Sequence, residues 1–361
     1  MINKIYKIFL FYILKIPLMK KIIIKISNVI TFDKKQRRLN RKYLSEYCER
    51  MEVINLEKKY SDYWIFPLFS PWGDLVIACS LIKSFKHKNG GKILVLVSDK
   101  NRARVAKSFK SIDKVIIQNK KILGYINTNP HTKIKKGFYY EINHWLFVDA
   151  PNYKSKNFLE LYSNMLGLSE GTIIERPTFS EEVKVSVQHY IQKKHIKPEH
   201  TIILAPQANS FKSKNISMDF WINLANQLEK EGYDIIFNSS KKIKNYKTIF
   251  LPMIETLYLS EICKGVIGLR AGYNDILGIM QIKNLFAIYP QSMFFNTISK
   301  FVQLLEFKRS FLDEKDKSFD ENMYRITSLK MFGDATAKEY IYSNNDVKII
   351  NNIIQNLKSS K

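Results

Sequence analysis

Short apolar runs alternate with helical patterns along this chain of 361 residues, and this alternation constrains the fold more than any single motif does. Near the start, apolar runs at 63–69, 92–98 and 115–117 are separated by helical periodicity at 75–85 and 100–109. Runs that are apolar throughout are typical of strands covered on both faces, and a helix between two strands favours their parallel pairing. The sequence therefore predicts an α/β fold with a doubly wound parallel sheet.

The same alternation starts again near residue 200, after the segment IKPE, which we interpret as a linker. Further strands are expected at 201–205, 233–238, 248–251, 266–267 and 285–289, and helices at 181–194, 218–231, 254–263 and 346–357. We predict a basic amphipathic segment at 1–60, a Rossmann-like domain at 61–195, a second one at 200–330, and a C-terminal helix within 340–361 that packs back on the first domain. Two such domains are expected to face a central cleft.

The segment CKGVIGLRAGYNDILGIMQIKNLFAIYP at 263–290 has the pattern of a strand, a glycine turn, a helix and a strand. Gly268, Arg270 and Gly272 are expected in the turn, Asn274 as the helix cap and Asp275 in the first helical turn. Such a turn directs free N–H groups and the positive end of a helix outward, and an arginine there is able to bind two phosphate oxygens. Two interpretations stay open: a diphosphate site, or an ordinary turn with a surface arginine.

The formal net charge of +25 attracts anions of several kinds. However, the lysines are spread along the chain, and no zinc finger, RRM signature or compact basic helix is present, so we expect no nucleic-acid partner. The three cysteines, Cys48, Cys79 and Cys263, form no C-x-x-C pair, which argues against a disulfide framework or a zinc site. This cysteine usage suits a reducing cytoplasm.

Residues 1–30 combine lysines with short apolar runs, the longest of which, at 8–14, is far too short to span a bilayer. No small-residue cleavage site follows, so a signal peptide is not indicated. On a helical wheel Lys4, Lys7 and Lys15 share one side next to an apolar surface, which is typical of a helix lying in an anionic membrane interface. We expect peripheral association with the inner face of the cytoplasmic membrane; the alternative is a helix packed on the protein itself.

Several nucleotide-binding and metal-binding motifs are missing from the chain. No G-x-G-x-x-G follows the first predicted strand, and no G-x-x-x-x-G-K-[ST] occurs, which argues against a dinucleotide oxidoreductase and a P-loop NTPase. No H-E-x-x-H and no D-x-D is present. We therefore expect neither a metal nor a cofactor.

Three stretches resemble, in the expected order, the GT-B glycosyltransferases of the lipopolysaccharide heptosyltransferase family. SPWGDLVIACSLIKSFK is similar to the family's glycine–aspartate turn and first helix. IILAPQANSFKSKNISMDFWINLANQLEKEGYDIIF is similar to the opening of its second domain, with Ala205-Pro206-Gln207 where the family has His-Pro-Gly. LYLSEICKGVIGLRAGYNDILGIMQIKNLFAIYP is similar to its nucleotide-sugar turn and the strand that follows.

The resemblance implies roles for individual residues. Asp74 would be the base that takes the proton of the acceptor hydroxyl, the alternative being a cap of the helix that follows. Either Lys212 or Lys214 would be the phosphate-binding lysine, and Asp275 would bind a ribose hydroxyl or cap its helix. The complete set of expected donor-binding residues is Gly73, Gln207, Lys212, Lys214, Arg270, Gly272, Tyr273, Asn274 and Asp275.

The expected function is transfer of a sugar from a nucleotide-diphosphate sugar to a bacterial cell-surface glycan, such as lipopolysaccharide, lipooligosaccharide or capsule. The resemblance implies an inverting and metal-independent reaction, because cationic groups would serve the leaving diphosphate. Two alternatives belong to other functional classes. One is a catalytically silent GT-B-like protein that binds a sugar nucleotide, and the other is a basic nucleic-acid-binding protein.

Overall fold

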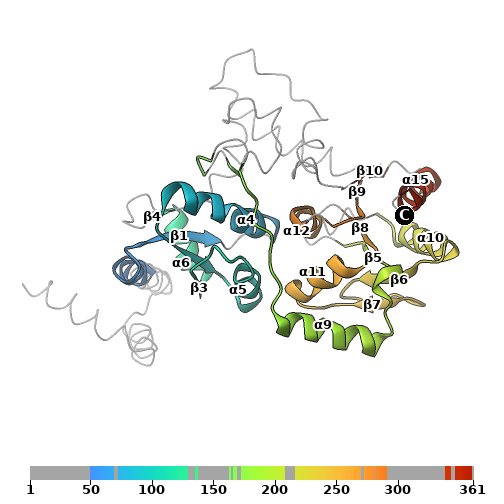
Figure 1. Ribbon diagram of the computed structural model, residues 1–361, viewed down its shortest axis with the longest axis horizontal. Helices are drawn as coiled ribbons and strands as arrows, with labels where there is room; N and C mark the ends of the chain where they lie inside the picture. Colours follow the sequence, from blue (N-terminus) through green and yellow to red (C-terminus); the bar gives the residue numbers. More distant parts are fainter. Residues whose placement is uncertain are drawn as a thin grey trace, which may run out of the picture.

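The computed structural model describes residues 49–68, 72–128, 135–136, 162–163, 166–168, 172–207, 216–269, 272–280, 282–290, 338–342 and 346–359. Two β-sheets lie within these ranges, one of four strands and one of six (Figure 1). Every pairing between neighbouring strands is parallel. The predicted α/β class with parallel sheets is therefore confirmed.

The first sheet has the strand order β3-β2-β1-β4. Its elements, in chain order, are β1 (Tyr63–Leu68), α4 (Trp72–Asn89), β2 (Lys92–Val97), α5 (Lys100–Ala106), β3 (Lys114–Ile117), α6 (Lys120–Thr128) and β4 (Lys135–Lys136). Strands β2 and β3 extend the sheet on one side of β1, and β4 pairs on the other side. The strand order therefore reverses at β1, and α4 begins beyond the carboxyl end of this strand.

The second sheet has the order β10-β9-β8-β5-β6-β7, which is the Rossmann order when strands are counted from β5. Its elements are α9 (Glu181–Lys194), η2 (Pro198–His200), β5 (Thr201–Ala205), α10 (Met218–Lys230), β6 (Asp234–Asn238), β7 (Lys247–Ile249), α11 (Met253–Ile262), β8 (Gly265–Leu269), α12 (Gly272–Met280), β9 (Leu285–Pro290), β10 (Lys338–Tyr342) and α15 (Asp346–Lys358). The order reverses between β5 and β8, where Ala205 pairs with Gly268. Ligands of open α/β sheets bind outside the carboxyl ends of the strands at such a reversal.

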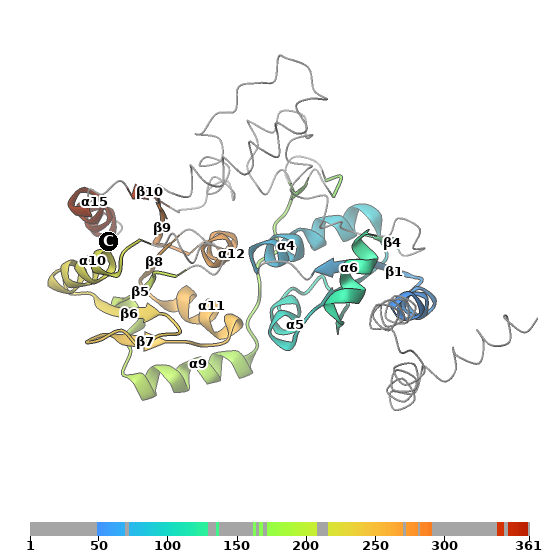
Figure 2. The ribbon, with the colours of Figure 1, turned by 180° about the vertical axis from the view of Figure 1, so that it is seen from behind.

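A connecting strap at 172–180 runs between the two sheets and leads into α9 (Figures 1 and 2). The N–H of Glu175 donates to the carbonyl of Ser80 in α4 over 2.8 Å, and the N–H of Thr178 donates to the carbonyl of Ser108 over 2.8 Å. Ser180 then accepts from the N–H of Val183 and caps α9. The strap is thus hydrogen-bonded to the first sheet's helical layer before the chain enters the second sheet's layer.

One apolar core is shared by helices of both sheets. It contains Leu75 and Val76 of α4 together with Ile276 and Leu277 of α12, all of which are fully buried. Helices α5, α9 and α11 contribute further buried residues to the same core. Burial of apolar surface therefore stabilises the packing of the two helical layers on each other, as well as the packing of each layer on its own sheet.

An ion pair also links the two helical layers. Arg104 of α5 donates from Nη1 to Oε2 of Glu255 in α11 over 3.1 Å, and Nη2 donates to the other carboxylate oxygen. The side chain of Glu255 is only 7% exposed, whereas that of Arg104 is 37% exposed. Phe179 of the strap also packs against Tyr258 of α11, with ring centroids 5.2 Å apart.

Two expectations about the elements are wrong. Helix α4 begins at Trp72, so the residues expected as a turn before residue 75 form its first helical turn. Helix α15 packs on α10 and not on the first domain, because Ile350, Ile353 and Leu357 belong to the second core, together with Phe220. The helical period was correct, but an apolar stripe does not specify which of two available cores will cover it.

None of the helices in the described ranges is both long and apolar enough to cross a membrane. The N-terminal segment 1–30, including Lys4, Lys7 and Lys15, lies outside the described residues, so its expected membrane helix stays a prediction.

Candidate active site

The first turns of α4 and α12 meet where the strand order of each sheet reverses. Both views show the two helices side by side, although α4 follows β1 of the first sheet and α12 follows β8 of the second (Figures 1 and 2). A Cβ added to Gly272 would lie 3.0 Å from the backbone nitrogen of Gly73. The approach is therefore close enough that a side chain at position 272 would displace the neighbouring turn.

This arrangement concentrates positive potential at one place. The first N–H groups of a helix have no intrahelical acceptor, and the helix dipole places partial positive charge there. Gly73 and Gly272 lie in two such first turns, which come from different sheets. A pair of helix N-termini that converge in this way favours an anionic ligand.

Asp74 lies in the first turn of α4 and is partly exposed. The hydroxyl of Tyr162 donates to Oδ1 of Asp74 over 2.8 Å. Because α4 begins at Trp72, Asp74 is a residue inside the helix and does not occupy the N-cap position. Tyr162 was not predicted, because it lies 88 residues from Asp74 and no spacing rule links the two positions.

An arginine is held next to this first turn. The guanidinium of Arg102 lies 4.7 Å from the ring centroid of Trp72, and it also pairs with the carboxylate of Asp99. Burial opposes ionisation of Asp99, but hydrogen bonds from the backbone and side chain of Arg102 outweigh it and lower the pKa of Asp99. Cation–π contact and ion pairing together fix the position of the arginine.

Asn274 is the third residue of α12, so the prediction that it caps this helix is wrong. Its side chain is fully buried, and Nδ2 donates to the carbonyl of Gly268 over 3.3 Å. Its Oδ1 has no hydrogen-bond partner among the described residues. Gly268, which was expected in the turn, instead lies inside β8. Asn274 thus connects the start of α12 to the strand that precedes it.

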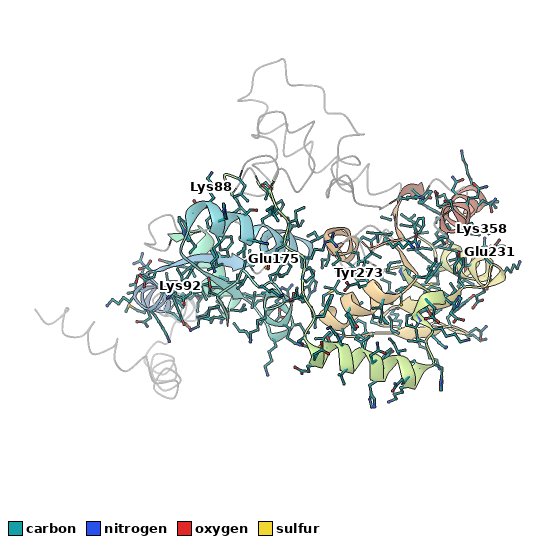
Figure 3. The ribbon with its side chains drawn as sticks, viewed as in Figure 1. Lys88, Lys92, Glu175, Glu231, Tyr273 and Lys358 are labelled. Carbon is teal, nitrogen blue, oxygen red and sulfur yellow. The ribbon has the colours of Figure 1, made fainter. Side chains whose placement is uncertain are left out.

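Tyr273 connects α12 to α11. Its hydroxyl lies 2.5 Å from Oγ of Ser260, and the residue lies between the two helices (Figure 3). Burial raises the pKa of the Tyr273 hydroxyl well above its usual value. The neutral phenol therefore persists at physiological pH as a hydrogen-bonding group within the protein.

The other predicted site residues are only partly placed. Gln207 follows β5 and is exposed at the carboxyl end of this strand, next to β8 in the sheet. Lys212, Lys214 and Arg270 lie outside the described residues, as does the side chain of Asp275. The structure thus brings together Gly73 and Asp74 with the first turn of α12. Across the described ranges, no group of three or more His, Cys, Asp or Glu residues is arranged to hold a metal ion.

Gly268→Ala is expected to destabilise the protein by about 1–3 kcal/mol, because a buried site without free space must rearrange. The added Cβ would lie 2.5 Å from Oδ1 of Asn274 and 3.3 Å from Cβ of Ala205. Urea unfolding measures the change in the free energy of unfolding. Gly124→Ala in α6 is the matched control. Apart from its chain neighbours and its own helix backbone, no described atom lies within 4 Å of the added Cβ, so a gain in stability of up to about 1 kcal/mol is expected. Equal effects of the two substitutions would contradict the close packing of Gly268.

No protein-family model and no curated protein matches this sequence. Comparison of structures finds similarity to the family 9 glycosyl transferase of Veillonella parvula, with 11% identity over 83% of this chain and 97% of the other, at a TM-score of 0.54. The Escherichia coli ADP-heptose lipopolysaccharide heptosyltransferase II matches with 13% identity over 63% of this chain and 84% of the other, at a TM-score of 0.47. The E. coli heptosyltransferase WaaC with ADP matches with 10% identity over 83% and 99%, also at 0.47.

The resemblance predicted from the three sequence stretches is therefore confirmed at the level of the fold, by the match to the family 9 glycosyl transferase of Veillonella parvula. At 11% identity, the similarity to the Veillonella protein concerns the fold. This chain has the fold of a family 9 glycosyl transferase.

Proposed function

We propose that this protein is a glycosyltransferase that moves a sugar from a nucleotide-diphosphate sugar to a bacterial surface glycan, such as lipopolysaccharide, lipooligosaccharide or capsule. The observation that carries the proposal is the meeting of the first turns of α4 and α12, which places Asp74 next to two helix N-termini. The fold shared with a family 9 glycosyl transferase supports the same reaction class.

Sugar transfer requires a base for the acceptor hydroxyl, stabilisation of the leaving diphosphate and exclusion of water. In our proposal Asp74 is the base, and the N–H groups of Gly272 to Asn274 bind the diphosphate. Arg270 and one of Lys212 and Lys214 add positive charge to this site. Because these groups neutralise the leaving group, we propose a reaction without a metal ion, and direct displacement would invert the configuration at the anomeric carbon.

We further propose that two domains of the chain bind different substrates. Residues 61–195 would form the acceptor domain and residues 200–330 the nucleotide-sugar domain, with the reaction in a cleft between them. The Rossmann order of the second sheet supports this assignment, because its reversal point between β5 and β8 lies next to α12.

A thermal-shift screen of nucleoside diphosphates and their sugars tests the proposal. A ligand present at 100 times its dissociation constant stabilises the native state by about 2.7 kcal/mol, so a matching donor raises the melting temperature. Release of the nucleoside diphosphate from that donor, with or without an acceptor glycan, then measures turnover. Binding with turnover supports the proposal, binding without turnover indicates a silent sugar-nucleotide-binding protein, and no stabilisation by any nucleotide would contradict both.

We also propose that residues 1–30 hold the protein on the inner face of the cytoplasmic membrane. Lys4, Lys7 and Lys15 would contact acidic head groups while the apolar side enters the interface. The full chain is expected to sediment with vesicles that contain anionic lipid, and a variant that lacks residues 1–30 is expected to stay in the supernatant. Equal sedimentation of the two proteins would contradict this proposal.

A further inference from the structure

We propose that Tyr162 is a positioning residue that holds the carboxylate of Asp74 in its catalytic orientation. The inference rests on the proposed function, because it assigns a role to Tyr162 in the same reaction. Its starting point is the hydrogen bond from the Tyr162 hydroxyl to Oδ1 of Asp74, which measures 2.8 Å and joins residues 88 positions apart.

The ring of Tyr162 is fixed by its surroundings. Tyr162 is 1% exposed and belongs to the apolar core that α4 and α12 share. Its carbonyl accepts from the N–H of Leu166 over 3.1 Å, so the backbone of Tyr162 is hydrogen-bonded as well. A tyrosine held in this way cannot swing its hydroxyl away from Asp74 without disturbing the core.

The segment that carries Tyr162 is attached to α4 at a second place. Nζ of Lys88, which lies near the end of α4 (Figure 3), donates to the carbonyl of Gly167. Tyr162 meets the first turn of this helix through Asp74, and Gly167 meets its last turn through Lys88. Two attachments along one helix fix Tyr162 and Gly167 relative to α4, so the hydroxyl is aligned with the carboxylate before a substrate binds.

The hydrogen bond has a defined role in the reaction. As the acceptor oxygen forms its bond to the anomeric carbon, the bond from that carbon to the diphosphate oxygen breaks, and the nucleoside diphosphate leaves with the electron pair. The proton of the acceptor hydroxyl passes to the Asp74 carboxylate, while Tyr162 keeps its own proton throughout. By donating to Oδ1, Tyr162 sets the plane of the carboxylate that accepts the proton.

Tyr162→Phe distinguishes the role of the hydroxyl from that of the ring, because phenylalanine keeps the packing of the ring and removes only the hydrogen-bond donor. We expect kcat to fall by roughly 10- to 100-fold, the scale of losses when a catalytic group is held less well, with KM for the donor within about threefold. In the Asp74→Asn background the same substitution is expected to cause no further loss, since residues that act as a unit are not additive.

Tyr246→Phe is the matched control, because the Tyr246 hydroxyl also donates to a side chain, Oδ1 of Asn226 over 2.5 Å, but lies next to β7 and away from Asp74. Its kcat is expected to stay within about twofold of the parent. A readout without turnover uses protein labelled with ¹³C at the aspartate carboxyl carbons. The Asp74 resonance, identified by its loss in Asp74→Asn, is expected to move in Tyr162→Phe and to stay in place in Tyr246→Phe.

An unchanged Asp74 resonance in Tyr162→Phe, or a kcat within twofold of the parent, would overturn the assignment of Tyr162. Failure of the proposed function has a different signature, because Asp74→Asn would then retain turnover or the parent protein would consume no donor. The carboxyl resonance still decides the role of Tyr162 in that case, since it reports the hydrogen bond itself and requires no substrate.

Discussion

Asp74→Asn is expected to lower the rate of sugar transfer by about 10²- to 10⁴-fold and to leave donor affinity within about threefold, the range typical of removing a general base. Asparagine has nearly the same size, and its amide oxygen can still accept the hydrogen bond from Tyr162. It cannot take a proton from the acceptor hydroxyl, however. The loss should therefore appear in kcat and not in the binding of the nucleotide sugar.

Single-turnover assays and calorimetric titration with the donor measure the two quantities separately. Asp113→Asn serves as the control, because Asp113 is also a hydrogen-bonded carboxylate of the first unit. It accepts from Nζ of Lys86 over 2.8 Å and from the N–H of Ile93 over 2.7 Å, near the start of β2 and away from the meeting helices. Its turnover is expected to stay unchanged. If Asp74→Asn retained turnover within threefold of the parent, Asp74 would be a structural residue of α4.

Arg104→Met is expected to lower the free energy of unfolding by about 2–3 kcal/mol. Removing one partner of a buried ion pair typically costs 3–5 kcal/mol, because the remaining charge is left without compensation. The expected loss is smaller here for two reasons. Arg104 is 37% exposed, and Glu255 lies in the first turn of α11, where the helix dipole stabilises a negative charge. Methionine retains much of the apolar stem of arginine, so the change reports mainly the lost charge.

Urea denaturation of Arg104→Met, Glu255→Gln and the double variant gives the coupling energy of the pair in a double-mutant cycle. Lys184→Met is the comparison, since Lys184 pairs with Glu181 on the surface of α9, with side chains 40% and 82% exposed. Its loss of stability should be much smaller than that of Arg104→Met, as for most exposed ion pairs. If Arg104→Met cost no more than Lys184→Met, the ion pair would not stabilise the packing of the two helical layers.

The elements most closely predicted from sequence are those whose signals are local. Helix α9 was expected at its observed bounds, because Ser180 before an acidic first turn marks its start. Strand β5 was also expected at its bounds, since the mainly apolar run TIILA between His200 and Pro206 allows few other interpretations. The start of α4 was misplaced because the dipeptide Ser70-Pro71 and the following Gly73 suggested a turn up to residue 74, whereas α4 already begins at Trp72.

Only those residues of the site that lie close to the end of a strand in the sequence were predictable. Asp74 was found because it follows a strand and resembles a known motif. Gly272 was found because glycines after the predicted strand suggested a turn, although Gly272 is the first residue of α12. Tyr162 and Glu255 were not found, since they act through contacts across 88 and 151 positions of the chain. Such contacts depend on how the two helical layers pack on each other. The periodicity and spacing of residues within one segment do not predict that packing.

The shared core also limits how this protein can be recombined with its structural neighbours. A chimera that takes the second sheet and its helices from a structural neighbour would place foreign α11 and α12 surfaces against the native α4 and α5. Mismatched apolar side chains between these helices would leave voids or clashes, and each of them lowers the stability of the protein. Grafting of a foreign second sheet should therefore give a stable protein only when the facing surfaces of α4 and α5 are transplanted along with it.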